Sequence, residues 1–290
     1  MAFIDSALVA LRESLEAFLI LGILLGIAHK TGQTAARKPL LWGALAGLLA
    51  SILLGVLANG VAHELYEANE ALFEGVASLF AVAILTYMVI WMYRHTKGLV
   101  GALHTQMKKA LSLGKPALLW GIAFVAVLRE GVETVLFVAG KLPSDGVPLT
   151  VFALLTGIAV SAILAYLIFA GVLKLSLERF MAATGLMLVV IAAGLFAYGV
   201  HELREAGVFA DTTGMLYDIS ATLPHKGDAD GVNTLGEAIG SLLYGLVVYR
   251  SKATVLEGLS WFAYAVPMGL WVASKLRAKR AASPPASPPV

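Results

Sequence analysis

The stretch LRESLEAFLI, residues 11–20, places an arginine and two glutamates inside an otherwise apolar segment, and LREGVETVLF, residues 128–137, does so again. On a helix with 3.6 residues per turn, the pattern R-E-x-x-E puts the arginine and the second glutamate one turn apart, where they can pair. It also puts the two glutamates on one stripe of the helix. The two motifs consist of Arg12, Glu13, Glu16 and of Arg129, Glu130, Glu133.

The composition around these motifs is that of a protein embedded in lipid. Hydrophobic residues make up 59% of the chain and charged residues 14%, and the mean hydropathy is +0.83. Soluble domains carry about 25% charged residues, so we expect an all-α polytopic membrane protein. The net charge of +2 gives no indication of a nucleic-acid partner, and the absence of cysteine excludes disulfides and thiolate metal sites.

Apolar segments long enough to cross a bilayer occur seven times, since a spanning helix needs about 20 mostly apolar residues. We interpret the first as a retained helix and not as a cleaved signal, because its core is charged. The predicted spans are residues 4–28, 40–62, 72–93, 117–140, 149–173, 180–201 and 254–274.

Basic residues predict the orientation, because they are enriched in cytoplasmic loops. They concentrate in the first and third loops and in the C-terminal tail, whereas the second loop and the long sixth loop are more acidic. The N-terminus is therefore predicted outside and the C-terminus in the cytoplasm. Within the sixth loop, LGEAIGSLLYGLVVY, residues 235–249, is short and broken by glycine, so we predict an external helix and not an eighth span.

The two motifs align together with their flanks, and ASLFAVAIL in the third segment resembles TGLMLVVIA in the sixth. Two units of three helices follow, and because three is odd the second unit must be inverted. Such inverted repeats are common in transporters, with the substrate site at the midplane. We expect a single permease domain, 1–277, with repeat one at 4–93, repeat two at 117–201, an external segment at 202–253, the seventh helix at 254–274 and a disordered tail at 278–290.

The cost of burying these charges favours a functional site. One charged residue at a helix centre costs about 2.5–3.5 kcal/mol, so six would cost on the order of 15–20 kcal/mol before pairing. A structural interpretation, in which arginine–glutamate pairs lock helices together, does not account for a second copy of the motif. Four carboxylates are hard oxygen ligands that suit hard cations, and two arginines reduce their charge from −4 to −2.

Paired R-E-x-x-E motifs in the first and fourth of seven helices resemble the high-affinity iron permeases, which include the oxidase-linked fungal ferric permease and its bacterial relatives. The resemblance extends to HELREAG, residues 201–207, to YDIS, residues 217–220, and to the segment at 235–249. It implies that Glu13, Glu16, Glu130 and Glu133 translocate iron, with Arg12 and Arg129 supporting them.

Acidic and histidine residues near the predicted outer helix ends are candidates for cation capture, although each also fits a solvated helix end, a helix dipole or a turn. Met88 and Met92 are interpreted as packing or lipid-facing residues, and Trp91 as part of an interfacial aromatic belt. The capture candidates are His63, Glu64, Glu67, Glu70, Glu74, His201, Glu202 and Asp218.

The sequence thus predicts a multi-pass permease of the bacterial plasma membrane and not an enzyme. It would import ferric or ferrous iron as substrate, with no permanently bound cofactor. Membrane lipid and an external oxidase or periplasmic iron-delivery protein are the expected partners. Import of another cation such as manganese or lead is an alternative, as is a structural scaffold. A di-iron enzyme is disfavoured because no E-x-x-H pair lies within a predicted span.

Overall fold

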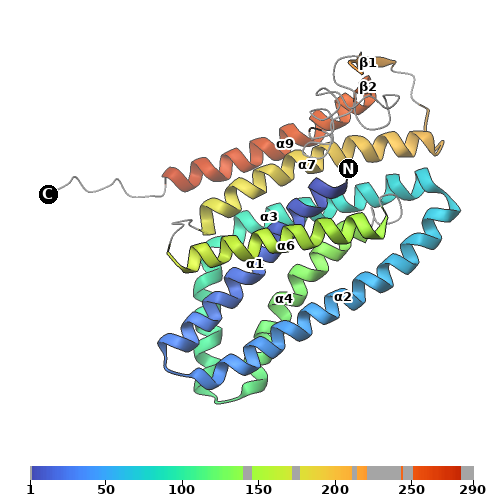
Figure 1. Cartoon of the computed structure of the whole chain (residues 1–290). Helices are drawn as coiled ribbons and strands as arrows, with labels where there is room; N and C mark the ends of the chain where they lie inside the picture. Colours follow the sequence, from blue (N-terminus) through green and yellow to red (C-terminus); the bar gives the residue numbers. More distant parts are fainter. Residues whose placement is uncertain are drawn as a thin grey trace.

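The computed structural model describes residues 2–139, 146–171, 177–210, 214–220, 243 and 251–281. The protein is an all-α polytopic membrane protein, with one short antiparallel strand pair (Figure 1). Its elements are α1 (Ala2–Lys30), η1 (Thr34–Ala36), α2 (Arg37–Ala68), α3 (Glu70–Ser112), α4 (Pro116–Ala139), α6 (Val147–Phe169), α7 (Leu177–Glu205), β1 (Met215–Asp218), β2 (Lys252–Thr254) and α9 (Val255–Ala281).

Within the described residues, five helices are both long enough and apolar enough to cross a membrane. α1 and α4, with 29 and 24 residues, are also long enough. They differ from the five because each carries the three charges of a motif, and those charges are what lipid would reject. The five apolar segments are Thr34–Ala68, Glu70–Arg94, Val147–Phe169, Ala183–Glu205 and Val255–Arg277.

Several helices are longer than the sequence predicted. α3 runs for 43 residues to Ser112, so most of the expected third loop is helical. The helix accommodates Gly98 and Gly101, and no proline occurs before Pro116. The expected second loop is reduced to Asn69, whose side chain caps α3 by accepting a hydrogen bond from the Leu72 amide. α9 continues to Ala281, so the first residues of the expected disordered tail are helical.

The predicted parts that lie outside the described residues are the external helix at 235–249, except for residue 243, and the tail at 282–290.

The chain has two halves, one formed by α1, α2 and α3 and the other by α4, α6 and α7, and the second helix of each half is exchanged, which means that it packs mainly on the other half. α2 packs chiefly on α4, and α6 packs chiefly on α1, so each second helix covers the first helix of the other half. α3 lies along α7, α1 contacts α4, and α9 covers α7 (Figure 1). Apart from the contact of α9, which belongs to neither half, swapping the two halves would leave this set of principal contacts unchanged.

Glycines allow α2 to approach α4 closely, and α6 to approach α1 closely. A Cβ on Gly47 of α2 would lie 2.7 Å from the carbonyl oxygen of Phe124 and 3.0 Å from the amide of Leu128 on α4. A Cβ on Gly157 of α6 would lie 2.4 Å from the carbonyl oxygen of Ala7 and 2.8 Å from the amide of Leu11 on α1. Leu11 and Leu128 directly precede the two motif arginines. The motifs therefore lie where two backbones approach closely, as small residues permit in membrane helices.

The helices alternate in direction, so connections gather at two ends of the bundle. In Figure 1 the α1–α2 and α3–α4 connections and the C-terminal end of α9 lie on the left, and the α2–α3 junction and the strand pair lie on the right. The α1–α2 and α3–α4 connections, the helix ends beside them and the last turns of α9 contain the basic residues Lys30, Arg37, Lys38, Lys108, Lys109, Lys115, Lys275 and Arg277. The junction on the right carries acidic residues, among them Glu64, Glu67 and Glu70.

The glycine contacts give a stability prediction. Gly47→Ala and Gly157→Ala should each destabilise the protein by about 1–3 kcal/mol, because the added methyl group meets backbone atoms that cannot rotate away. Gly60→Ala on α2 is the matched control, since a Cβ there meets nothing within 4 Å. The unfolding midpoint of purified protein in detergent measures the effect, and equal midpoints for all three variants would contradict it.

Candidate metal site

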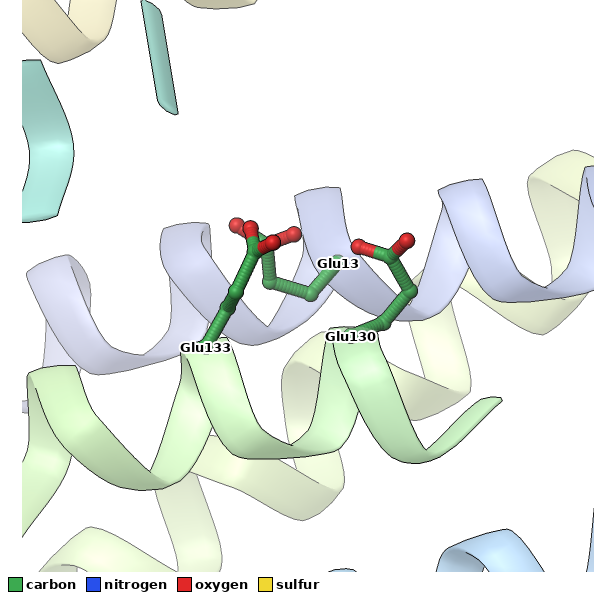
Figure 2. A group of neighbouring side chains, drawn as sticks. All are labelled: Glu13, Glu130 and Glu133. Carbon is green, nitrogen blue, oxygen red and sulfur yellow. The ribbon is translucent and has the colours of Figure 1, made fainter. Parts of the chain in front are cut away.

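The crossing of α1 and α4 brings carboxylates of both motifs together. Glu13 of α1 and Glu130 and Glu133 of α4 each offer a ligand oxygen, and these oxygens all lie within 4.8 Å of one another (Figure 2). Within the described part of the chain, they form the one group of three or more acidic or histidine side chains close enough to hold a metal ion. Carboxylate oxygens at this spacing suit hard divalent cations.

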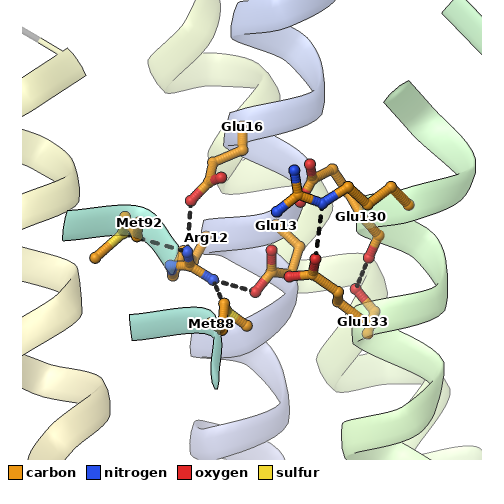
Figure 3. Close-up of polar contacts among 9 residues, drawn as sticks. Arg12, Glu13, Glu16, Met88, Met92, Glu130 and Glu133 are labelled. Atoms are coloured by element: carbon orange, nitrogen blue, oxygen red, sulfur yellow. Dashed lines mark hydrogen bonds and ion pairs between the residues drawn. The ribbon is translucent and has the colours of Figure 1, made fainter. Parts of the chain in front are cut away.

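The expected arginine–glutamate pairs at i and i+4 form in both motifs. Arg12 Nη2 lies 2.7 Å from Glu16 Oε1, and Arg129 Nε lies 3.0 Å from Glu133 Oε1 (Figure 3). Arg12 also donates to Glu13, which the helical spacing alone did not indicate. Three of the four expected carboxylates therefore lie in one group. The fourth, Glu16, pairs with Arg12 and lies outside that group.

Two carboxylate oxygens in the group lack a hydrogen-bond donor among the described residues. They are Oε2 of Glu13 and Oε2 of Glu130, on residues that are 1% and 4% exposed. A buried, unsatisfied carboxylate oxygen costs on the order of 1–3 kcal/mol or more. A cation between these oxygens would satisfy both, so the arrangement is suited to a ligand.

A cavity of about 670 Å³ between α1, α2, α4 and α6 reaches the group from one side. Glu13 and Glu130 line it, whereas Glu16, Glu133 and both arginines do not. Most of its wall is apolar, and the polar side chains besides the two glutamates are Ser14, Ser51, Asn59, Thr134 and Thr150. In each motif, the first glutamate therefore borders the cavity and the second is held by the arginine.

The arginines of both motifs contact α3, which does not line the cavity. The guanidinium of Arg12 lies against the sulfur of Met88 and 3.5 Å from the sulfur of Met92 (Figure 3). The guanidinium of Arg129 lies over Trp91, with 3.7 Å between Cζ and the ring centre. The methionines are buried, as a packing role predicted, but Trp91 contacts the motif and not only a membrane boundary. No feature of the α3 sequence indicated these contacts, because thioethers and indoles are common in any apolar helix.

The acidic capture candidates lie at the α2–α3 junction and along α3 and α7, and their contacts are local except for that of Glu74 with α7. His63 Nε2 lies 3.3 Å from Glu67, and both side chains are exposed, as is Glu64. Glu70 accepts a hydrogen bond from Tyr66, and Glu74 accepts one from Tyr198. Glu202 is half-buried on α7. Glu202 and Glu74 share Tyr198 as a hydrogen-bond partner, so these two acids lie near each other. Among the described residues, the capture candidates do not form a group of three with the spacing of metal ligands.

His201 is buried between two carboxylates. Its Nδ1 lies 2.8 Å from Glu257 of α9, and its Nε2 lies 2.9 Å from Glu205 of α7. Both ring nitrogens thus have partners, and the histidine joins α7 to α9 in place of facing an incoming ion. Glu257 was not identified from the sequence. The pattern T-x-x-E at Thr254–Glu257 marks a helix start, and its capping contact is present at 3.3 Å, but nothing in it indicates the histidine.

Asp218 lies on the exposed strand β1 and caps its own turn. It accepts hydrogen bonds from the amide of Ser220 at 3.0 Å and from the Ser220 hydroxyl at 2.6 Å, and Lys252 lies 3.8 Å away. These hydrogen bonds lower the pKa of the Asp218 carboxyl from its usual range. The contacts favour the turn-forming interpretation of this residue.

Comparison with known proteins identifies relatives along nearly the whole chain. The model of the Iron permease FTR1 family matches residues 4–278. The ferrous iron permease EfeU of Escherichia coli O6:K15:H31 and that of Shigella sonnei are each 30% identical over 264 residues, covering 90% of this chain and 91% of theirs. The ferrous iron permease EfeU of Yersinia pestis is 28% identical over 263 residues, covering 90% of this chain and 89% of its own. No solved structure matches.

The unequal burial of the two arginines predicts unequal effects on stability. The Arg12 side chain is 2% exposed, and Arg129 is 35% exposed. Arg12→Gln should cost about 3–5 kcal/mol, because it leaves buried carboxylates unpaired, and Arg129→Gln should cost clearly less. Thermal unfolding in detergent measures both, with Arg94→Gln at an exposed position as the control. A larger loss for Arg129→Gln would contradict the difference in burial.

Proposed function

The chain belongs to the iron permease FTR1 family, and we propose that it imports iron across the bacterial plasma membrane through the carboxylate group formed by Glu13, Glu130 and Glu133. Membership of a permease family makes it a transporter of iron and not an enzyme. The observation that carries the proposed site is the meeting of both motifs at one point, with an unpartnered, buried oxygen on Glu13 and on Glu130.

Ferrous iron is the substrate that we propose. The relatives described above are named ferrous iron permeases. The charge of the site agrees with a divalent ion, since four carboxylates and two guanidiniums sum to −2 and Fe²⁺ would neutralise them. Iron passes through as cargo in this proposal, and no permanently bound cofactor takes part.

The four glutamates have different roles in this proposal. Glu13 and Glu130 border the cavity and take the ion first. Glu133 completes the ligand set when it exchanges Arg129 for the metal, and Glu16 holds Arg12 beside the site. Because Arg129 stays near Glu133, it can recover that carboxylate when the ion leaves, and release is as necessary to transport as capture.

The membrane topology is the second part of the proposal. Seven spans, α1, α2, the first part of α3, α4, α6, α7 and α9, form a single permease domain, 1–277, with the N-terminus outside and the C-terminus in the cytoplasm. The exchange of α2 and α6 between halves supports a three-plus-three inverted repeat. The basic residues at one end of the bundle support the orientation.

The acidic end of the bundle would then face outward. Glu64, Glu67, Glu70, Glu74 and Glu202 would raise the local concentration of cations there. An external iron-delivery protein or oxidase would release its iron at this end. His201 and Asp218 would have structural roles at this end of the bundle, through their contacts with Glu257 and Ser220 respectively.

Uptake by vesicles that contain only this protein tests the substrate. We expect Fe²⁺, kept reduced under anaerobic conditions, to accumulate faster than Fe³⁺ supplied as a soluble chelate. Mn²⁺ accepts the same oxygen ligands, so it is the competitor that tests the alternative cargo. Faster accumulation of Mn²⁺ than of Fe²⁺, or of Fe³⁺ than of Fe²⁺, would overturn the assignment to ferrous iron.

Neutral variants of the motif glutamates test the site. Glu13→Gln and Glu130→Gln keep the size of the side chain but remove a ligand charge, and each should reduce uptake at least about a hundredfold if one carboxylate ligand is worth about 3 kcal/mol. Glu16→Gln and Glu133→Gln should also impair transport, because they release an arginine into the site. Lys108→Gln, at an exposed position of α3 outside the motifs and the acidic end, is the control and should retain most activity. Normal uptake by either Glu13→Gln or Glu130→Gln would refute a shared site.

Single cysteines test the orientation, since the chain has none of its own. Thr105→Cys on the basic end should resist a membrane-impermeant thiol reagent added to intact cells, and Glu67→Cys on the acidic end should react. Both residues are exposed, so lysed cells should label both equally. The reverse pattern in intact cells would invert the proposed topology.

A further inference from the structure

One turn of α3 contacts the arginines of both motifs, although it belongs to neither. Met88 and Met92 lie against Arg12, and Trp91 lies under Arg129. These three residues are at i, i+3 and i+4, so they share one face of the helix. The sequence alone offered no reason to connect this face with the carboxylates.

The two arginines are held differently. Arg12 contacts two carboxylates and two sulfurs, and its side chain is 2% exposed. Among the described residues, Arg129 contacts one carboxylate, through Nε, together with the Trp91 ring, and its side chain is 35% exposed. Arg129 therefore has fewer contacts to break and more room in which to move.

The carboxylates that the arginines hold are also different. Glu133, the partner of Arg129, belongs to the three-carboxylate group. Arg12 holds Glu16, which lies outside that group, and Oε1 of Glu13, which belongs to it. Oε2 of Glu13 has no donor among the described residues, so a cation can bind Glu13 through that oxygen and leave both contacts of Arg12 in place. Glu133 can join the ligand set through the oxygen that Arg129 holds only if Arg129 releases it.

The Trp91 ring can hold a guanidinium that has lost its counter-ion. The face of an indole attracts a cation through its quadrupole, and the ring itself carries no charge that iron would neutralise. At 3.7 Å from the ring centre, the Arg129 guanidinium already lies in this position while it is paired. Loss of the ion pair therefore need not displace it.

We propose that Arg129 is the arginine that yields its carboxylate to iron, and that Trp91 is a positioning residue that keeps the released guanidinium beside the carboxylate group and out of it. This inference rests on the proposed function and assigns unequal roles to the two motifs. Without the ring, the guanidinium would move back toward Glu133 and compete with iron. The apparent affinity for iron would then fall, while the maximal rate at saturating iron would change little.

Two substitutions of Trp91 test the role of the ring. Trp91→Leu removes the aromatic face and keeps an apolar side chain, and we expect the Kd for Fe²⁺ and the KM of uptake to rise about fivefold to thirtyfold. Trp91→Phe keeps a ring face and should restore most of the affinity. Trp271→Leu is the matched control, because Trp271 of α9 lies near Tyr93 and Lys275, away from the motifs. Anaerobic calorimetry of purified protein in detergent gives Kd, and vesicle uptake gives KM and maximal rate.

A double substitution separates this role from packing. In an Arg129→Gln background there is no guanidinium to hold, so adding Trp91→Leu should leave the Kd for Fe²⁺ unchanged. If Trp91 only packs α3 against the bundle, Trp91→Leu will weaken binding by the same factor in both backgrounds, and that result overturns the inference. An unchanged Kd in Trp91→Leu with Arg129 present also overturns it.

The Glu130→Gln variant separates failure of this inference from failure of the proposed function. If Glu130→Gln binds Fe²⁺ as tightly as the unchanged protein, the carboxylate site itself is wrong. If Glu130→Gln loses binding and Trp91→Leu does not, the site stands and only the role assigned to Arg129 and Trp91 is wrong. Calorimetry on both variants, purified in the same way, distinguishes these two outcomes from the expected one, in which both variants bind Fe²⁺ more weakly than the unchanged protein.

Discussion

The need to pair six charged side chains away from water is the constraint on which the rest of the structure depends. Lipid cannot solvate them, so Arg12, Glu13, Glu16 and their counterparts on α4 must satisfy one another inside the protein. The close approach of α1 and α4 does this, and the exchanged helices α2 and α6 hold that approach from outside through Gly47 and Gly157. Small residues at the contacts and charges at the centre are thus parts of one arrangement.

Within that arrangement the charges are not all satisfied. Arg12 pairs with Glu13 and Glu16 and Arg129 pairs with Glu133, while Glu13 and Glu130 each retain an oxygen without a donor among the described residues. Glu13 and Glu130 line the cavity, and the arginines contact α3. A protein that needed only stability would gain by pairing these oxygens. Two such buried oxygens, on residues that line a cavity, therefore favour transport over a purely structural role.

The acidic end of the bundle follows a different principle. There the charged groups bind one another in local pairs, such as His63 with Glu67, or join helices, as His201 does with Glu205 and Glu257. Pairs at exposed positions contribute little to stability, so the exposed acids serve better as an electrostatic surface than as a scaffold. The buried histidine instead fixes α9 on α7, which places the last helix of the domain.

The sequence by itself determined what depends on local periodicity: the helices, the i and i+4 pairing of each arginine with its glutamate, and the recurrence of the motif. It located the third spanning segment, which agrees with the apolar part of α3. It did not indicate that the helix continues to Ser112, because basic residues mark a membrane boundary without ending a helix. Only the tertiary structure decided that three carboxylates meet while Glu16 turns aside. It alone also showed that Met88, Trp91 and Met92 hold the arginines. Those facts depend on where helices far apart in the chain cross, and helical periodicity contains no information about the rotation and depth of such a crossing.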